Sequence, residues 1–457
     1  MEHYDRGEHM GAEALILLVT LAAAWFIIAA SASMISAGWA RLILLSFLLL
    51  SFHYRDRLGK RGRVVLAGTA LATIGFYTAA AITVMRANIA NPPEWDFQLF
   101  WIFGRVAVRG LNFYQPEYLH QLLGPLRPSA EFMRELFFFH PPPTMFLFVP
   151  LGWFDIHTAF LIWYCFNCAI LAIDIILLWR IFQRQAGLLG LLLTTALVLM
   201  LPATLWTISY GQTNFIFLLM ILLFWMERDH PRGGLWLAIG IFAKPLLVFL
   251  PIYPLLRRHW RVLGGMIVAL AVISLLSMVV FGPSTFANYF TGNPIVNSMP
   301  ASLYTESVNQ SLLANVLRLT DYDFSQSSPY TQPLFIILAL LLTVSTAWLL
   351  YWIEQPQADW ALALTLVLAL LIFPKTLVHY SVLLLVPICL IWSQRHQLPG
   401  HVWSAIAFIT LEYALINHNG SAIFIAIALC WAILLGVAVR KCIRRPIYVE
   451  TDTNHIC

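Results

Sequence analysis

Residues 262–282 read VLGGMIVALAVISLLSMVVFG, a run of 21 residues without a charged side chain. A helix of about 20 apolar residues is long enough to cross the hydrocarbon core of a bilayer, whereas apolar helices in soluble cores are usually shorter. The run therefore predicts a transmembrane helix. Further runs of the same kind along the chain decide the fold class.

The composition of the whole chain indicates the same class of protein. Of the 457 residues, 60% are apolar and 11% are charged, whereas soluble domains have about 45–50% apolar and about 25% charged residues. At about 20 residues per crossing, the apolar residues suffice for about 13 or 14 helices and leave little sequence for a soluble domain. We expect an all-α polytopic membrane protein with about 12–14 transmembrane helices and extracytoplasmic loops that carry short amphipathic helices.

Hydropathy places the individual spans. They are expected near 13–33, 36–54, 64–85, 157–182, 187–207, 212–227, 262–282, 332–353, 358–373, 377–393, 400–417 and 420–440. Two further stretches, 141–155 and 233–256, are apolar but interrupted by prolines. Proline removes a backbone donor and breaks helices, so these two stretches predict short or re-entrant helices.

The basic residues predict the orientation of the chain. Its net charge of +5 comes from 27 Lys and Arg against 22 Asp and Glu. Cytoplasmic loops of membrane proteins are enriched in Lys and Arg, and the densest basic cluster lies at 55–63. If that cluster faces the cytoplasm, 18 of the 27 basic residues share its side, and the loops 86–140 and 283–331 face outward. Because the basic clusters are short and dispersed, no nucleic acid is expected as a partner.

Asp96 is the first candidate for chemistry. It directly follows a predicted transmembrane helix, so its carboxylate is expected at the membrane interface, where it stays ionised within reach of a lipid-borne substrate. The aromatic pattern of residues 97–109 predicts an amphipathic segment that lies flat on the membrane. Asp is also a preferred N-cap residue, so a purely capping role is the alternative.

Several polar residues interrupt apolar segments on the same predicted outer side. Ionisable residues inside membrane segments are costly and are functional candidates for that reason. Lys244 is the clearest case, because it lies within an apolar segment and Pro245 follows it; a Lys that snorkels to the interface is the alternative. The other candidates for substrate binding are Gln212, Asn214, Asn309, Gln310, Lys375, His379, Tyr380 and His140. For His140, a purely structural role is an equal alternative. No motif with metal-ligand spacing occurs, so neither a metal nor another cofactor is expected; a metal shared by Asp96 and a bound phosphate group is the alternative that stays open.

Taken in chain order, these motifs resemble glycosyltransferase family 87, over roughly residues 64–395. The fragments that carry the resemblance are WDF at 95–97, GLNFY at 110–114, FHPP at 139–142, GQTN at 211–214, AKP at 243–245, RRHWR at 257–261, ESVNQS at 306–311 and HY at 379–380. At position 140 this chain has His where the family usually has Tyr.

The resemblance implies a GT-C fold and a mannosyltransferase of the bacterial plasma membrane that acts on the extracytoplasmic side. Its donor would be a polyprenyl-phosphate sugar, and its acceptor a glycolipid or glycan. We expect one integral membrane domain, 1–457, that comprises an N-terminal helix pair (1–63), a catalytic GT-C module (64–282, with the loop 86–140), a second outer loop (283–331) and C-terminal helices (332–457). The oligomeric state stays open.

The resemblance implies the role of Asp96, and the chemistry of the other side chains suggests theirs. Asp96 would be the general base of an inverting transfer. Lys244, Lys375 and His379 would bind the donor phosphate by charge-assisted hydrogen bonds. Amide side chains would orient the sugar hydroxyls, and these belong to Gln212, Asn214, Asn309 and Gln310.

Two other functions remain open at this stage. A transporter or flippase would place charged residues near the bilayer midplane and often has two related halves, but here the polar residues gather on one side and no duplication is visible. A GT-C polymerase or ligase would use a diphosphate-linked glycan. Mannose is the family's usual sugar, and arabinose or glucose would need only modest changes in the pocket.

Overall fold

The computed structural model describes residues 59–92, 96–115, 118, 140–292, 304–320, 328–352, 358–394 and 422–443. These residues are helical almost throughout, and the β-structure within them is an isolated antiparallel bridge between Asn309 and Leu377. The predicted spans at 13–33, 36–54 and 400–417 lie outside the described residues.

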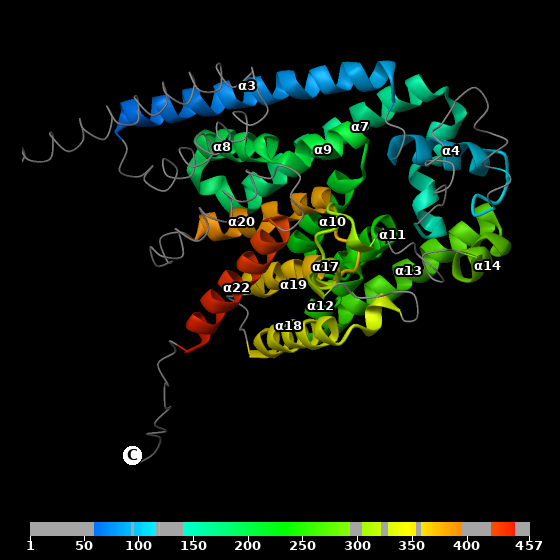
Figure 1. Ribbon diagram of the computed structural model, residues 1–457. Helices are drawn as coiled ribbons and strands as arrows, with labels where there is room; N and C mark the ends of the chain where they lie inside the picture. The colour runs from blue at the N-terminus through cyan, green and yellow to red at the C-terminus, as the bar shows by residue number, and fades with distance from the viewer. Residues whose placement is uncertain are drawn as a thin grey trace, which may run out of the picture.

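Among the described residues, five helical stretches are long and apolar enough to cross a membrane. They are α3 (Lys60–Ala90), α7 (Ile156–Leu178) with α8 (Gly187–Met200), α13 (Trp260–Phe281), α18 (Pro333–Trp352) and the Ile423–Arg440 part of α22 (Ala422–Ile443). Shorter helices stand between them in the order of the chain and are shown in Figure 1. They are α9 (Pro202–Tyr210), α10 (Asn214–Glu227), α14 (Pro283–Gly292), α17 (Leu312–Thr320), α19 (Ala358–Ile372), η8 (Val378–Leu384) and α20 (Leu385–Ser393). The chain is an all-α polytopic membrane protein, as its composition predicted.

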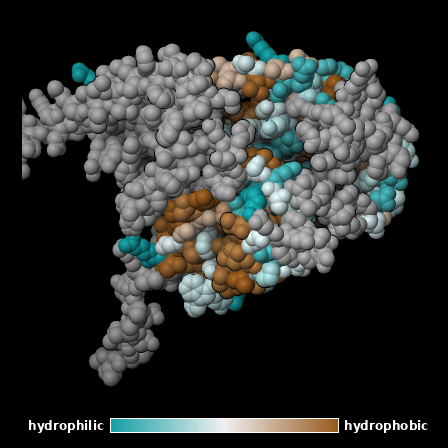
Figure 2. All heavy atoms as spheres, in the orientation of Figure 1, coloured by the Kyte–Doolittle hydropathy of each residue, from teal (hydrophilic) through white to brown (hydrophobic). Residues whose placement is uncertain are grey.

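Burial separates the helices at the centre from those at the periphery. Nearly every side chain of α10 and α19 is buried, as expected for helices that are apolar on all sides. By contrast, α13 and α18 expose large apolar residues such as Val279 and Val344. Figure 2 shows apolar side chains over α18 and α22 on the face in view. These outer faces are suited to contact lipid.

The two proline-containing stretches form short helices, as predicted. Residues 141–155 contain the 3₁₀ helices η1 (Pro142–Leu147) and η2 (Val149–Trp153), each only about 10–12 Å long. In the other stretch, α11 (Pro231–Ala243) ends at Lys244, whose backbone is extended. The chain then continues through η5 (Pro245–Phe249) and α12 (Ile252–Leu256).

The expected membrane-surface helix is instead buried in the protein. In α4 (Asp96–Val108), the aromatic residues Phe97, Phe100 and Trp101 are at most 5% exposed. Phe97 packs edge-on against Phe160 with ring centroids 4.7 Å apart, and Phe100 stacks on Phe148 at 4.3 Å. The prediction that this segment lies flat on the membrane was therefore wrong.

Glycines explain why α4 packs so closely. A Cβ atom at Gly104 would lie 2.3 Å from the carbonyl oxygen of Phe148, and one at Gly152 would lie 2.5 Å from the backbone of Gly104. Only residues without a side chain allow α4 and η2 to approach to this distance. The contact fixes the helix whose first residue is Asp96.

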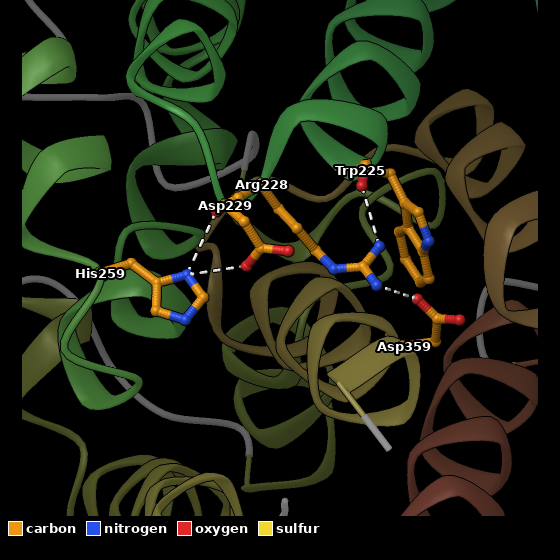
Figure 3. Close-up of polar contacts among 5 residues, drawn as sticks. All are labelled: Trp225, Arg228, Asp229, His259 and Asp359. Atoms are coloured by element: carbon orange, nitrogen blue, oxygen red, sulfur yellow. Dashed lines mark hydrogen bonds and ion pairs between the residues drawn. The ribbon is translucent and has the colours of Figure 1, made fainter. Parts of the chain in front are cut away.

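A polar cluster joins α10, α13 and α19 (Figure 3). The guanidinium of Arg228 lies 2.9 Å from the carboxylate of Asp359 and packs on the ring of Trp225. His259 Nδ1 lies 3.3 Å from the carboxylate of Asp229 and 3.2 Å from the carbonyl oxygen of Arg228. The cluster ties the last turn of α10 to the first turns of α13 and α19. The opposite ends of α10 and α19 lead to the candidate site.

Candidate functional site

The predicted site residues lie at helix ends and breaks. Asp96 is the first residue of α4, and Gln212 lies in the turn between α9 and α10. Lys244 occupies the break after α11, and Lys375 lies in the turn between α19 and η8. The turn before Gln212 needs Gly211, which has a left-handed backbone (φ +66°) and would place a Cβ 2.9 Å from Phe97.

Asp96 interacts with the three other positions. Its half-buried carboxylate accepts a hydrogen bond from the side chain of Gln212. It is also close enough to Lys244 and Lys375 for their positive charges to lower its pKa. Burial raises the pKa of Asp96 to about 6, although the Gln212 hydrogen bond and the two lysines oppose the rise. The first turn of a helix also carries partial positive charge. A residue that only capped α4 would need none of these distant partners.

Lys244 points into the protein. Its side chain is 7% exposed, and its Nζ atom lies 4.2 Å from the ring centroid of Tyr380 and 5.9 Å from that of Phe217. Such contacts stabilise an ammonium group over an aromatic face. The alternative that Lys244 snorkels to a membrane interface does not agree with this burial.

His140 is buried beside the lysines. Its ring makes a hydrogen bond to the backbone of Ala243, and its carbonyl oxygen accepts a hydrogen bond of 2.6 Å from the hydroxyl of Tyr114. Burial, together with the charges of Lys244 and Lys375, holds the pKa of His140 well below its usual range. The imidazole is therefore neutral at physiological pH.

His379 and Asn214 meet on another side of the site. Asn214 Nδ2 donates to the Thr207 hydroxyl at 2.7 Å and to the carbonyl oxygen of His379 at 3.2 Å. Within the described part of the chain, the buried atoms His379 Nε2 and Asn214 Oδ1 have no hydrogen-bond partner. Buried polar atoms are nearly always paired in native structures, so both atoms are available to a bound molecule.

Asn309 and Gln310 use their amides within the protein. Asn309 Nδ2 donates to the carbonyl oxygen of Pro374 at 3.0 Å. Gln310 Nε2 donates to the carbonyl oxygen of Ser307 at 2.6 Å, and Gln310 Oε1 accepts from Phe424 N at 3.0 Å. Asn309 and Gln310 therefore contact backbone groups behind the Lys375 turn and lie apart from the other candidates. The structure groups the remaining candidates at one site: Asp96, Gln212, Lys244, Lys375, His140, His379, Asn214 and Tyr380.

Two contributors had no assigned role in the sequence. Tyr114 holds the backbone at His140, and Phe217 forms part of the aromatic surface around Lys244. Tyr114 belongs to the GLNFY fragment at 110–114, which was a usable signal. Phe217 lies in the uniformly apolar run of α10, so the sequence gave no signal for its role.

The arrangement suits a reaction that involves an anion and a proton transfer. Among the described side chains at the site, Asp96 supplies one negative charge, and Lys244 and Lys375 supply two positive charges when both are protonated. Burial lowers the pKa of Lys244 to about 7, although the charge of Asp96 opposes this shift. A carboxylate with a pKa of about 6 is an effective proton acceptor near neutral pH. Two ammonium groups beside it are typical of a site for a phosphate group.

Comparison with known proteins adds a family match. The sequence model of glycosyltransferase family 87 matches residues 138–374, which is more than half of the 457-residue chain. The matched region includes His140, Gln212 and Lys244, whereas Asp96 precedes it and Lys375 follows it directly. No curated protein matches the chain.

Proposed function

This chain belongs to glycosyltransferase family 87, and from that premise we propose that it transfers a sugar from a polyprenyl-phosphate donor to an acceptor hydroxyl, with Asp96 as the general base. We take mannose as the sugar, a glycolipid or glycan as the acceptor, and the extracytoplasmic side of a bacterial plasma membrane as the location. The observation that carries the proposal is the half-buried carboxylate of Asp96, which accepts a hydrogen bond from Gln212 and interacts electrostatically with Lys244 and Lys375.

The proposed reaction is a single inverting displacement. The acceptor oxygen attacks the anomeric carbon and forms the new glycosidic bond, while its proton passes to Asp96. The bond between the anomeric carbon and the phosphate oxygen breaks on the opposite face, and the phosphate leaves with the electron pair. A base with a pKa of about 6 is mostly ionised at pH 7 and still accepts a proton readily.

The charges at the site favour a monophosphate donor. Burial lowers the pKa of Lys244 to about 7, and the negative charge of a sugar phosphodiester favours its protonated form. With Lys244 protonated, the charges of the phosphodiester, Asp96, Lys244 and Lys375 sum to zero. After transfer, Asp96 is neutral and the phosphate monoester carries about two negative charges, so the sum stays at zero. A diphosphate-linked donor would add a further negative charge that the described side chains do not balance. This argument favours a polyprenyl-phosphate transferase over a polymerase or ligase.

Phosphate binding is further supported by His379. Its buried Nε2 atom has no partner among the described residues, and its ring lies close enough to Lys244 and Lys375 to feel their charges. A phosphate oxygen at this position would accept hydrogen bonds from all three side chains. Such bonds strengthen as charge develops on the leaving phosphate.

Replacement of Asp96 by Asn tests the proposal. In nanodiscs with a polyprenyl-phosphate-mannose donor, we expect Asp96→Asn to lower kcat by about 10²–10⁴-fold, the range for loss of a general base. Asp155→Asn is a matched control, because the exposed Asp155 caps α7 through the backbone amides of His157 and Thr158. If Asp96→Asn retained the activity of Asp155→Asn, Asp96 would have only a structural role. Transport of the lipid without a glycosidic product would instead support a flippase.

A further inference from the structure

The turn that carries Lys375 is held by side chains that precede α17. The carbonyl oxygen of Pro374 accepts two hydrogen bonds, one from Asn309 Nδ2 at 3.0 Å and one from the Ser311 hydroxyl at 2.9 Å. Asn309 and Ser311 are themselves buried. The peptide group that links Pro374 to Lys375 is therefore fixed on the side that faces α17.

Backbone hydrogen bonds continue on the other side of Lys375. Gln310 N donates to the carbonyl oxygen of Thr376 at 2.6 Å, and Val378 N donates to the carbonyl oxygen of Val308 at 3.0 Å. The two segments also share the isolated antiparallel bridge. Lys375 thus lies in a turn whose backbone is pinned before and after it.

The segment that holds the turn is anchored in its own right. The guanidinium of Arg318, on α17, donates to the carbonyl oxygen of Glu306 at 2.8 Å and to that of Asn309 at 3.1 Å. The side chain of Gln310 accepts from Phe424 N at the start of α22. Helices α17 and α22 therefore provide a rigid support for the Lys375 turn.

A lysine in this role needs such a support. Its four-carbon side chain has large rotational freedom, and a charge that interacts with both a base and a phosphate must be placed accurately to be effective. Lys375 is half-buried and acts electrostatically on Asp96, His140 and Lys244. Fixing its backbone limits the positions that its ammonium group can reach.

We propose that Asn309 and Ser311 are positioning residues that hold the Pro374 carbonyl group and thereby place the ammonium of Lys375 beside Asp96 and the donor phosphate. Asn309 acts through Lys375 and does not bind sugar. Ser311, which has no role in the sequence-based site, joins the machinery. That Lys375 binds the donor phosphate rests on the proposed function. That Asn309 and Ser311 position Lys375 rests on their hydrogen bonds to the Pro374 carbonyl group.

A double-mutant cycle tests the coupling. We expect Ser311→Ala to raise the donor KM by about 3- to 10-fold, the effect of about one hydrogen bond, with a smaller change in kcat and an unchanged acceptor KM. Lys375→Ala should raise the donor KM further. In the Lys375→Ala background, Ser311→Ala should change the donor KM by less than about twofold, because residues that act through one group are not additive.

Two further variants separate positioning from general stability. Ser311 also caps α17, because its hydroxyl accepts from Ala314 N at 3.1 Å. Asn315→Ala removes a hydrogen bond of 2.8 Å to the Ser311 carbonyl oxygen in the same helix but leaves the Pro374 contact, so it should lower the melting temperature without changing the donor KM. Ser311→Thr keeps the hydroxyl and should restore the donor KM.

Three results would overturn all or part of the inference in distinguishable ways. If Ser311→Ala raised the donor KM equally in the wild-type and Lys375→Ala backgrounds, Ser311 would act independently of Lys375, and the proposed function would stand. If Lys375→Ala left the donor KM unchanged, both the positioning role and the proposed phosphate site would be wrong. If Asn309→Ala raised the donor KM equally in the wild-type and Lys375→Ala backgrounds, Asn309 would bind the sugar directly.

Discussion

The raised pKa of Asp96 makes the rate depend on pH in a range where an ordinary carboxylate would not. The base must be ionised to accept a proton, so activity is lost as the pH falls through its pKa. With a pKa of about 6, about 91% of Asp96 is ionised at pH 7 and about 9% at pH 5, so the ionised fraction of the base, and its contribution to kcat/KM for the donor, should fall about tenfold between these values. With an unperturbed pKa of 3.8, the loss would be only about 6%.

The assay is the initial rate of sugar transfer in nanodiscs at subsaturating donor, from pH 5 to pH 8. A phosphodiester donor does not titrate in this range, and burial holds the pKa values of His140 and His379 well below their usual range, so the acid limb reports Asp96. Burial also lowers the pKa of Lys244 to about 7, so loss of its proton should add a separate alkaline limb to the same profile. Gln212→Leu removes a hydrogen bond that lowers the pKa of Asp96 and should therefore move the limb to higher pH. A rate that is flat between pH 7 and pH 5 in the wild-type protein would refute the reasoning.

Three other changes have defined outcomes. Lys244→Ala should raise the donor KM by at least about tenfold, because it removes a buried partner of the phosphate. The rate measured as a function of donor concentration gives this KM, and an unchanged value would remove Lys244 from the phosphate site. Gly104→Ala should destabilise the fold by about 1–3 kcal/mol, because the new Cβ atom would lie 2.3 Å from Phe148 O and displace α4. The displacement should also lower kcat, and an unchanged melting temperature would contradict the close packing of α4. Asp359→Asn breaks the half-exposed ion pair to Arg228 and should cost at most about 1 kcal/mol; thermal unfolding measures the cost, and a changed donor KM would show that this cluster influences the site.

Hydropathy and proline positions predicted much of the helical architecture among the described residues. The apolar runs at 64–85, 262–282 and 332–353 correspond to α3, α13 and α18, and the break at Lys244 was expected from Pro245. These features depend on local composition and on a missing backbone donor, so they can be read from one sequence.

The burial of α4 had no such local signal. An aromatic face has the same periodicity whether it meets lipid or protein, so Phe97 and Phe100 were compatible with both environments. The deciding feature is the close approach of Gly104 to Gly152, which lies 48 residues further along the chain. Such a contact between distant glycines is not visible in hydropathy.

The site itself was predicted in part. The sequence indicated that Asp96, Lys244, Lys375 and Gln212 share one side of the membrane. In the structure Gln212 donates a hydrogen bond to Asp96, and the two lysines lie close enough for their charges to lower the pKa of Asp96. The sequence did not reveal that the Asn309 amide donates a hydrogen bond to the Pro374 carbonyl oxygen, because an amide side chain can bind a sugar hydroxyl or a backbone group equally well. Only the fold decides which partner lies within reach.

The central claim is that a lipid-linked sugar phosphate binds between Lys244 and Lys375 with its anomeric carbon accessible from Asp96. A cryo-electron microscopy structure of the Asp96→Asn variant with a polyprenyl-phosphate-mannose donor tests it most directly. We predict phosphate density within hydrogen-bond distance of Lys244 Nζ and His379 Nε2, with the sugar between the phosphate and residue 96. Donor density elsewhere, with this site open only to water, would contradict the account.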